Sequence, residues 1–79
     1  MKILYFAQIA RALGRREDEL QVPAPLDADA LWARLIEHSA ALAPFRATAR
    51  FVRNGEYADP TEQFSDHDEV GLLPPVSGG

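Results

Sequence analysis

Apolar side chains gather in short segments at both ends of the chain, in a pattern typical of strands. Residues 2–7 (KILYFA) are largely β-branched, aliphatic or aromatic and predict a strand that is buried on at least one face. Residues 19–22 alternate polar with apolar side chains and stop at Pro23, which predicts a second, shorter strand. Residues 69–73 (EVGLL) predict a closing strand. The chain is therefore expected to begin and end in strands.

Between these segments the apolar period changes to that of a helix. Residues 9–14 predict one helical turn closed by Gly14 in the left-handed conformation. A longer helix is expected from about residue 28 to residue 42, with Asp27 as its N-cap and Pro44 ending the run. Its apolar side chains fall on one stripe, widened by two neighbours: Ala28, Leu31, Trp32, Leu35, Ile36 and Leu42. It is the one predicted helix that is long enough to cover a sheet.

A hairpin is predicted after this helix. Residues 49–53 read as a strand, and Asn54-Gly55 is the dipeptide that a type I′ turn favours, because both positions need positive φ. The order strand, strand, helix, strand, short strand, strand indicates an α+β fold. It permits the β-grasp arrangement, in which one helix crosses a mixed sheet whose first and last strands are central. The pattern leaves open whether Phe51 or Val52 faces the core.

Composition and charge narrow the possible functions. The chain has 79 residues, 47% hydrophobic and 25% charged, which fits one globular domain and argues against a disordered chain. Without cysteine it cannot form disulfides, Cys-ligated zinc sites, iron–sulfur clusters or a catalytic thiol. The net charge of −4 argues against nucleic acid as a partner and favours a neutral or basic protein. No apolar run has the length of a membrane span and no signal peptide is recognised, so we expect a cytoplasmic protein with no membrane partner.

Few side chains could carry catalytic chemistry. His38 falls on the predicted helix and His67 in a predicted turn, where solvated roles are expected. The run from Asp66 to Glu69 has the composition of a metal site, but neighbouring residues in an extended segment point to opposite faces and cannot converge on one ion. None of the three serines, Ser39, Ser65 and Ser77, has a nearby histidine to act as a base. We therefore expect no active site, metal or bound cofactor in this chain.

The end of the sequence has a different character. Pro74 and Pro75 lack amide donors, so the chain must leave the sheet there, and residues 1–75 are expected to form the folded domain. Residues 76–79 are then a flexible tail that could reach roughly 13–14 Å. The tail consists of Val76, Ser77, Gly78 and Gly79. Because glycine has no Cβ, such a tail can thread a channel too narrow for other residues.

These last residues carry a family resemblance. Asp66-x-Asp68-Glu69-Val70, followed by Leu73-Pro74-Pro75-Val76-Ser77-Gly78-Gly79, closely resembles the small-subunit family of molybdopterin synthase, the sulfur carriers of molybdenum-cofactor biosynthesis. The opening residues 3–7, and Asn54 before a short hairpin, are similar to the same family, and the resemblance covers the whole chain. Thiamine sulfur carriers share the Gly-Gly end but usually lack the Pro-Pro. One departure is His67, which stands where the family commonly has glycine, so we expect a turn with positive φ there.

The resemblance implies a ubiquitin-like β-grasp fold and a defined cycle. An adenylating enzyme similar to ubiquitin-activating enzymes would use ATP to activate the carboxylate of Gly79, and a sulfur donor would convert it to a thiocarboxylate. The tail, from Pro74 to Gly78, would then thread into the large catalytic subunit of a heterotetrameric molybdopterin synthase. There the sulfur would pass to cyclic pyranopterin monophosphate. The carrier itself would bind no cofactor.

Two alternatives stay open. A sulfur carrier of another pathway, for thiamine or for transfer-RNA thiolation, would use the same Gly79 with another partner. A plain ubiquitin-like binding module would have no use for a Gly-Gly end.

A docking face is predicted on the side of the sheet away from the helix. Strand alternation that directs Tyr5 toward the helix directs Phe6 away from it. An inward Leu72 likewise places Leu73 outside. Because a single helix covers one face only, large apolar side chains on the other face imply a partner. We expect Phe6, Tyr57 and Leu73 to form this face around the exit of the tail.

Overall fold

A five-stranded mixed sheet crossed by one main helix makes up the fold in the computed structural model, which describes residues 1–75. The elements are β1 (Lys2–Tyr5), α1 (Ala7–Leu13), β2 (Glu17–Glu19), α2 (Ala28–His38), the 3₁₀ helix η1 (Ala40–Phe45), β3 (Arg50–Arg53), β4 (Glu56–Tyr57) and β5 (Glu69–Leu73). The strand order is β2-β1-β5-β3-β4, with β1 and β5 parallel and the other neighbouring pairs antiparallel. The predicted α+β fold with β-grasp topology is confirmed. The predicted tail, residues 76–79, lies outside the described residues.

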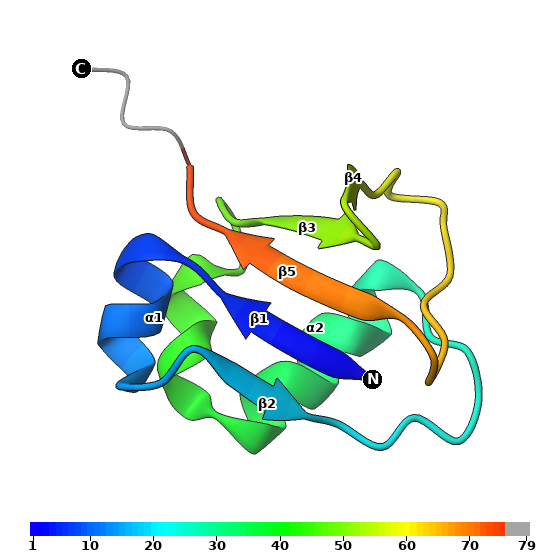
Figure 1. Cartoon of the computed structure of the whole chain (residues 1–79), viewed down its shortest axis with the longest axis horizontal. Coiled ribbons are helices and arrows are strands. Elements are labelled where there is room, and N and C mark those ends of the chain that lie inside the picture. The colour runs from blue at the N-terminus through cyan, green and yellow to red at the C-terminus, as the bar shows by residue number, and fades with distance from the viewer. Residues whose placement is uncertain (76–79) are drawn as a thin grey trace.

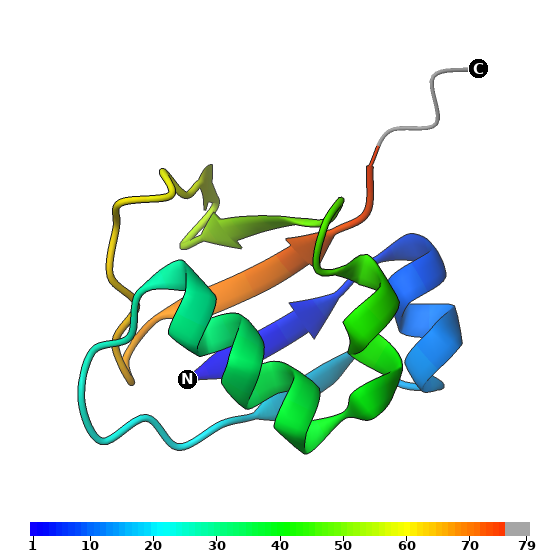
Figure 2. The same cartoon turned by 180° about the vertical axis from the view of Figure 1, so that it is seen from behind.

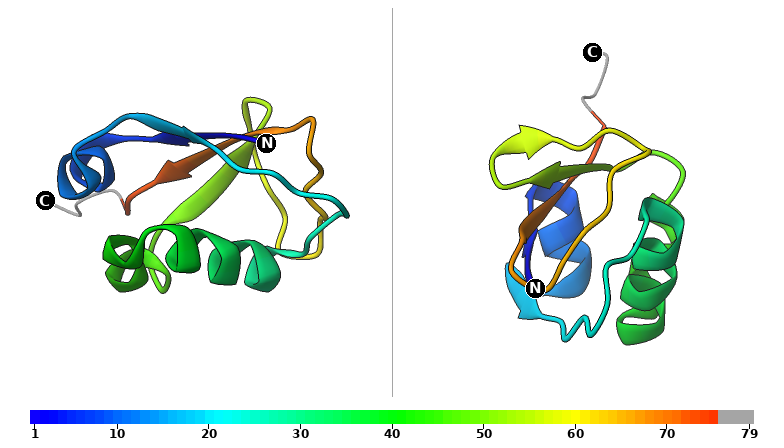
Figure 3. Two further views of the ribbon diagram at one scale, coloured as in Figure 1. Left: turned by 90° about the horizontal axis from the view of Figure 1, so that it is seen from below. Right: turned by 90° about the vertical axis from the view of Figure 1, so that its right-hand side faces the viewer.

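The sheet and α2 form two layers. Figure 1 views the sheet face-on with α2 behind it, and Figure 2 shows the opposite side, where α2 and η1 cover the strands. The edge-on views of Figure 3 separate the two layers. The short helix α1 lies at the end of the sheet where β1 and β5 finish (Figure 1). Within residues 1–75, no helix combines the length and the apolar content that crossing a membrane requires.

Three local signals act as the sequence predicts. The Oδ1 atom of Asp27 accepts a hydrogen bond from the N–H of Ala30 at 2.8 Å, which caps the first turn of α2. Gly14, with a φ of 72°, closes α1 in the left-handed conformation. Asn54 and Gly55 have φ values of 52° and 88° in the β3–β4 turn, as a type I′ turn requires.

The predicted end of the main helix is wrong. The helix was expected to run to residue 42, but α2 stops at His38 because Ser39 is extended, with φ −145° and ψ 98°. The Ser39 hydroxyl accepts a hydrogen bond from the Arg15 guanidinium, a contact between distant segments that helical periodicity does not encode. Leu42 is still fully buried, but it reaches the core from η1.

The predicted second strand is shifted by two residues at its start and ends earlier. It was expected at residues 19–22 and is observed at Glu17–Glu19. Because β2 runs antiparallel to β1, Glu19 already pairs with Lys2, the first residue of β1, and the chain beyond has almost no strand to pair with. Leu20 and Val22 are nevertheless buried, so their apolar positions were informative about the core.

The core fills the space between α2 and the inner face of the sheet. Its members include Ile3, Tyr5, Leu31, Trp32, Leu35, Leu42, Phe51, Phe64, Val70 and Leu72. The ring centroids of Trp32 and Phe51 are 4.9 Å apart, and Phe64 meets Phe51 edge-on at 5.2 Å. Phe51 therefore faces the core, and its neighbour Val52 faces the opposite side of the sheet.

Candidate functional site

An apolar row crosses the face of the sheet that α2 leaves uncovered. Leu4 pairs with Gly71, Gly71 pairs with Val52, and Val52 pairs with Tyr57, across β1, β5, β3 and β4. Residues directly opposite on neighbouring strands share one face, so these four lie on the same side. Leu4 and Val52 are half-buried, whereas Tyr57 is 61% exposed. We call this side of the sheet the outer face.

Phe6 lies over this row. It follows β1 directly and is 41% exposed, and a Cβ atom added to Gly71 would come within 2.8 Å of its Cε2 atom. The absent side chain of Gly71 thus makes room for the Phe6 ring to lie against the backbone of β5. Sequence reasoning missed this role of Gly71, although a glycine inside an apolar strand is a known mark of close approach.

Leu73 and Tyr57 also lie on the outer face, joined through an arginine. Leu73 is half-buried and pairs with Arg50 of β3. The guanidinium carbon of Arg50 stands 4.7 Å from the centroid of the Tyr57 ring, within cation–π range. Strand alternation therefore brings Phe6, Leu73 and Tyr57 to one face, with Arg50 between the last two. Within residues 1–75, Phe6 and Tyr57 are the large hydrophobic side chains that remain exposed.

The chain leaves the sheet beside this face. β5 ends at Leu73, and the half-buried Pro74 and exposed Pro75 follow without strand pairing. The end of β5 and helix α1 lie at the same end of the sheet (Figure 1). The predicted attachment point at Gly79 and the predicted threading residues Val76, Ser77 and Gly78 lie outside the described residues.

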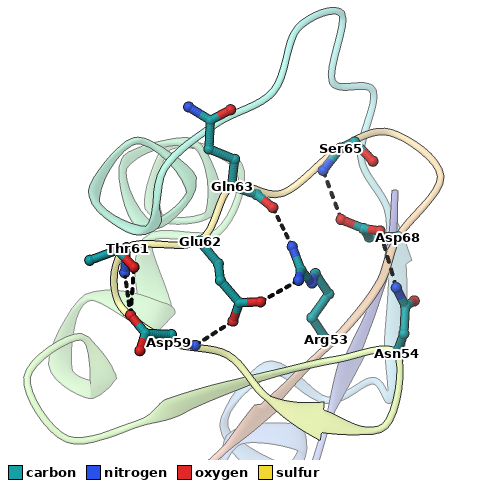
Figure 4. Close-up of polar contacts among 8 residues, drawn as sticks. All are labelled: Arg53, Asn54, Asp59, Thr61, Glu62, Gln63, Ser65 and Asp68. Atoms are coloured by element: carbon teal, nitrogen blue, oxygen red, sulfur yellow. Dashed lines mark hydrogen bonds and ion pairs between the residues drawn. The ribbon is translucent and has the colours of Figure 1, made fainter.

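The loop that leads into β5 is fixed by carboxylates and by Asn54 (Figure 4). The Asn54 side chain accepts from the N–H of Glu69 at 2.9 Å and donates to Asp68 at 3.1 Å. Asp68 also accepts from the N–H of Ser65 at 2.8 Å. Partial burial raises the pKa of the Asp68 carboxyl, but the hydrogen bonds from Ser65 and Asn54 outweigh it, so that the pKa lies below its ordinary value. The hydrogen bonds that Asp68 accepts at the start of β5 are thus strongest when its carboxyl is ionised.

The same loop corrects the prediction for His67. Within residues 1–75 the non-glycine residues with positive φ are Ala7 and Asn54, so the positive φ expected at His67 is wrong. The N–H of Asp68 donates to the carbonyl of Ser65 at 3.0 Å, which closes a turn that His67 occupies without left-handed geometry. Glycine is not required at this position.

The two aspartates near this turn, Asp66 and Asp68, bind different parts of the chain. Asp66 accepts from the N–H of Val22 at 2.9 Å and from the amino group of Met1 at 3.3 Å. The hydrogen bond from Val22 in particular lowers the pKa of the Asp66 carboxyl. Asp68, by contrast, binds Ser65 and Asn54. These two carboxylates anchor different segments and do not converge on a shared ligand.

His38 belongs to a polar cluster with Tyr5, Arg15 and Asp18. The Tyr5 hydroxyl donates to Asp18 at 2.7 Å, Arg15 donates to the same oxygen at 2.8 Å, and His38 Nε2 lies 3.6 Å from it. Burial, reinforced by the bond to Asp18, raises the pKa of the Tyr5 hydroxyl above its ordinary range. The cluster joins β1, β2 and the end of α2. Its geometry supports a structural role.

Comparisons with known proteins agree with this architecture. The family model described as "ThiS family" matches residues 3–79. The "Molybdopterin synthase sulfur carrier subunit" of Chlamydomonas reinhardtii is 35% identical over 81 residues, which covers 100% of this chain and 98% of that protein. Small archaeal modifier protein 1 from Haloferax volcanii has a similar structure, with a TM-score of 0.83, 29% identity and coverage of 100% of this chain and 98% of the other.

A solved complex contains a similar fold. It is the protein–protein complex of subunits 1 and 2 of molybdopterin-converting factor from Helicobacter pylori 26695. The matching chain has a TM-score of 0.68 and 20% identity, covering 99% of this chain and 96% of that one. At that identity the likeness concerns the fold. The family model and the full-length relative carry the assignment: this chain belongs to the ThiS family, together with the molybdopterin synthase sulfur carrier subunits that it matches.

Proposed function

We propose that this protein is the sulfur-carrier subunit of a molybdopterin synthase and that sulfur is attached at the carboxylate of Gly79. The observation that carries the proposal is the full-length match to proteins named as such carriers, with a family model that extends through residue 79. The absence of cysteine supports it, because sulfur cannot travel on a side-chain thiol of this chain.

The proposed chemistry takes place on the terminal carboxylate. A Gly79 oxygen attacks the α-phosphorus of ATP in a separate adenylating enzyme, and pyrophosphate leaves. A sulfur nucleophile then attacks the acyl carbon, AMP leaves, and a thiocarboxylate forms. Adenylation is needed because a carboxylate oxygen is a poor leaving group, and the thiocarboxylate then needs no base from the carrier. ATP is thus used by the partner enzyme, and this chain binds no cofactor.

The outer face is proposed to dock on the large catalytic subunit while the tail enters that subunit's active site. Phe6 and Tyr57 are exposed, and Leu73 stands directly before the tail. Pro74 and Pro75 would direct residues 76–78 into the channel. The complex of subunits 1 and 2 of molybdopterin-converting factor from Helicobacter pylori supports a partner of this kind. We propose a heterotetramer in which sulfur passes to cyclic pyranopterin monophosphate.

Intact-mass spectrometry tests the attachment. The chain is incubated with ATP, the adenylating enzyme and a sulfide source, and we expect one oxygen to be replaced by one sulfur, mapped to Gly79. A matched variant with one alanine added after Gly79 should stay unmodified. An unchanged mass of the wild-type chain would refute the carrier assignment.

A second candidate function rests on the similarity to small archaeal modifier protein 1. In this alternative, activated Gly79 is joined to an amine of another protein. Incubation of the activated chain with a cell extract would then give covalent adducts that survive thiol treatment. Free thiocarboxylate without adducts favours the carrier.

A further inference from the structure

A groove opens beside the outer face, between the end of β1, helix α1 and the start of β2. Its volume is about 700 Å³. Phe6, Ala7 and Ala10 form part of its apolar lining. Since Phe6 belongs to both, the groove continues the proposed docking surface toward α1.

The residues that line this groove carry a net positive charge, whereas the whole chain carries a net negative charge. The chain carries twelve acidic and eight basic residues, yet three arginines, Arg11, Arg15 and Arg16, line this one groove beside a single glutamate, Glu17. The lining is therefore a local basic site on an acidic protein.

Two of the three arginines keep their charge available. Arg15 is bound to Asp18, with 2.7 Å between Nη2 and Oδ2, and Glu17 lies 3.7 Å from Lys2. The side chains of Arg11 and Arg16 make no ion pair within the part of the chain that the structure describes. Their positive charge is free to meet a carboxylate from outside.

We infer that this groove binds an acidic segment of the large catalytic subunit, with an apolar side chain against Phe6 and Ala10 and carboxylates at Arg11 and Arg16. The inference rests on the proposed function, which supplies the partner. The apolar lining favours a polypeptide occupant, and the net charge of −4 disfavours a nucleic-acid backbone. Opposite charges at this point would guide the two surfaces into the register that places the tail at its channel.

The test is the dissociation constant for the isolated large subunit, measured by calorimetry for the full chain and three variants. Arg11→Glu/Arg16→Glu reverses both charges, and Arg11→Lys/Arg16→Lys keeps them. Arg46→Glu is the matched control, because Arg46 is an exposed arginine outside the groove that pairs with Asp29. Each variant is measured at roughly 0.05 M and 0.5 M salt, on either side of the ionic strength where the Debye length is about 10 Å.

We expect the double reversal to raise the dissociation constant at least about tenfold at low salt and much less at high salt. The lysine variant should stay within about twofold of wild type, and Arg46→Glu should bind as wild type does. Arg11 stands in the last turn of α1, where glutamate opposes the helix dipole, so Arg16→Glu alone is measured as a variant outside the helix.

Three results would overturn the inference. The first is that Arg11→Glu/Arg16→Glu binds the large subunit with the affinity of the wild-type chain. The second is that its loss of affinity is equal at both salt concentrations, and the third is that Arg46→Glu loses as much affinity as the double variant. If the wild-type chain itself fails to bind, the proposed partner and the groove assignment fall together. If the wild-type chain binds and the Arg11→Glu/Arg16→Glu variant binds equally well, the groove assignment falls and the proposed partner stands.

Discussion

At the scale of single residues, Gly71 determines where Phe6 can lie. The Phe6 ring occupies the space that a Cβ on residue 71 would need, at 2.8 Å. We predict that Gly71→Ala lowers the free energy of unfolding by about 1 kcal/mol, because the ring must leave its position against β5. In a Phe6→Ala background the same change should cost nearly nothing. Urea unfolding of the four proteins checks this coupling, and equal costs in both backgrounds would contradict it.

Asn54 combines backbone conformation with side-chain bonding. Its φ is 52°, and its amide bonds both Glu69 and Asp68. Asn54→Gly keeps the left-handed geometry but loses the bonds, so we expect a loss of about 1 kcal/mol. Asn54→Ala also adds left-handed strain, for a total of about 2 kcal/mol. Thermal or urea unfolding of both variants separates the cost of the lost hydrogen bonds from the cost of the backbone strain. An Asn54→Gly variant no more stable than Asn54→Ala would contradict this explanation.

Residue-scale features were only partly predictable from the sequence. The Asn54-Gly55 turn and the Asp27 cap follow from preferences that operate within a few residues. The φ of His67 was predicted incorrectly because the turn is closed by Asp68 and Ser65, which makes glycine unnecessary. Gly71 inside an apolar strand is a local sign of close approach, but the group that approaches, the Phe6 ring, lies 65 positions earlier in the chain and could not be identified from the neighbours of Gly71.

At the scale of elements, the loop between β4 and β5 is predicted to loosen in acid. The pKa values of Asp59, Asp66 and Asp68 lie below their ordinary value of 3.8. The folded state therefore binds fewer protons than the unfolded state, and the stabilisation, present above the ordinary value, is lost as pH falls through the lowered ones. Unfolding free energy measured from about pH 6 to pH 2 should fall along this range. The unfolding free energy of Asp68→Asn should fall less steeply with decreasing pH than that of the wild-type chain. An equally steep fall in that variant would contradict the assignment of part of the pH dependence to Asp68.

The elements themselves were predictable where the pattern was local. β5 and the start of α2 appear where the alternation and the cap place them, and β3 begins one residue later than predicted. β1 begins at Lys2 as predicted but ends at Tyr5 rather than residue 7, because the chain enters α1 at Ala7, two residues before the predicted helical turn. The shift of β2 follows from its register with β1, and Ser39, where α2 ends, is bound by Arg15. Both depend on segments that meet only in the folded chain. The topology was accessible because the order of elements, with one crossover helix, leaves few arrangements.

At the scale of the whole molecule, the two faces of the sheet differ: the inner face packs in the core, and the outer face is left uncovered by the helices. α2 and η1 cover the inner face (Figure 2), while Phe6, Tyr57 and Leu73 lie on the outer face, near the point where the chain leaves the sheet. We predict that Phe6→Ala weakens binding to the large catalytic subunit about tenfold or more, as expected of an aromatic contact at the centre of an interface. Calorimetric titration measures the loss. Glu37→Ala, an exposed change on α2, serves as the control and should bind normally.

The central claim is that sulfur carried at Gly79 becomes part of the molybdopterin product. The most direct measurement combines the thiocarboxylated chain, the large catalytic subunit and cyclic pyranopterin monophosphate, and follows dithiolene formation. We predict that the product forms in proportion to the thiocarboxylate consumed, and that a chain lacking Gly79 folds normally but gives none. A thiocarboxylated chain that binds the large subunit and still yields no dithiolene would contradict the account and assign the carrier to another pathway.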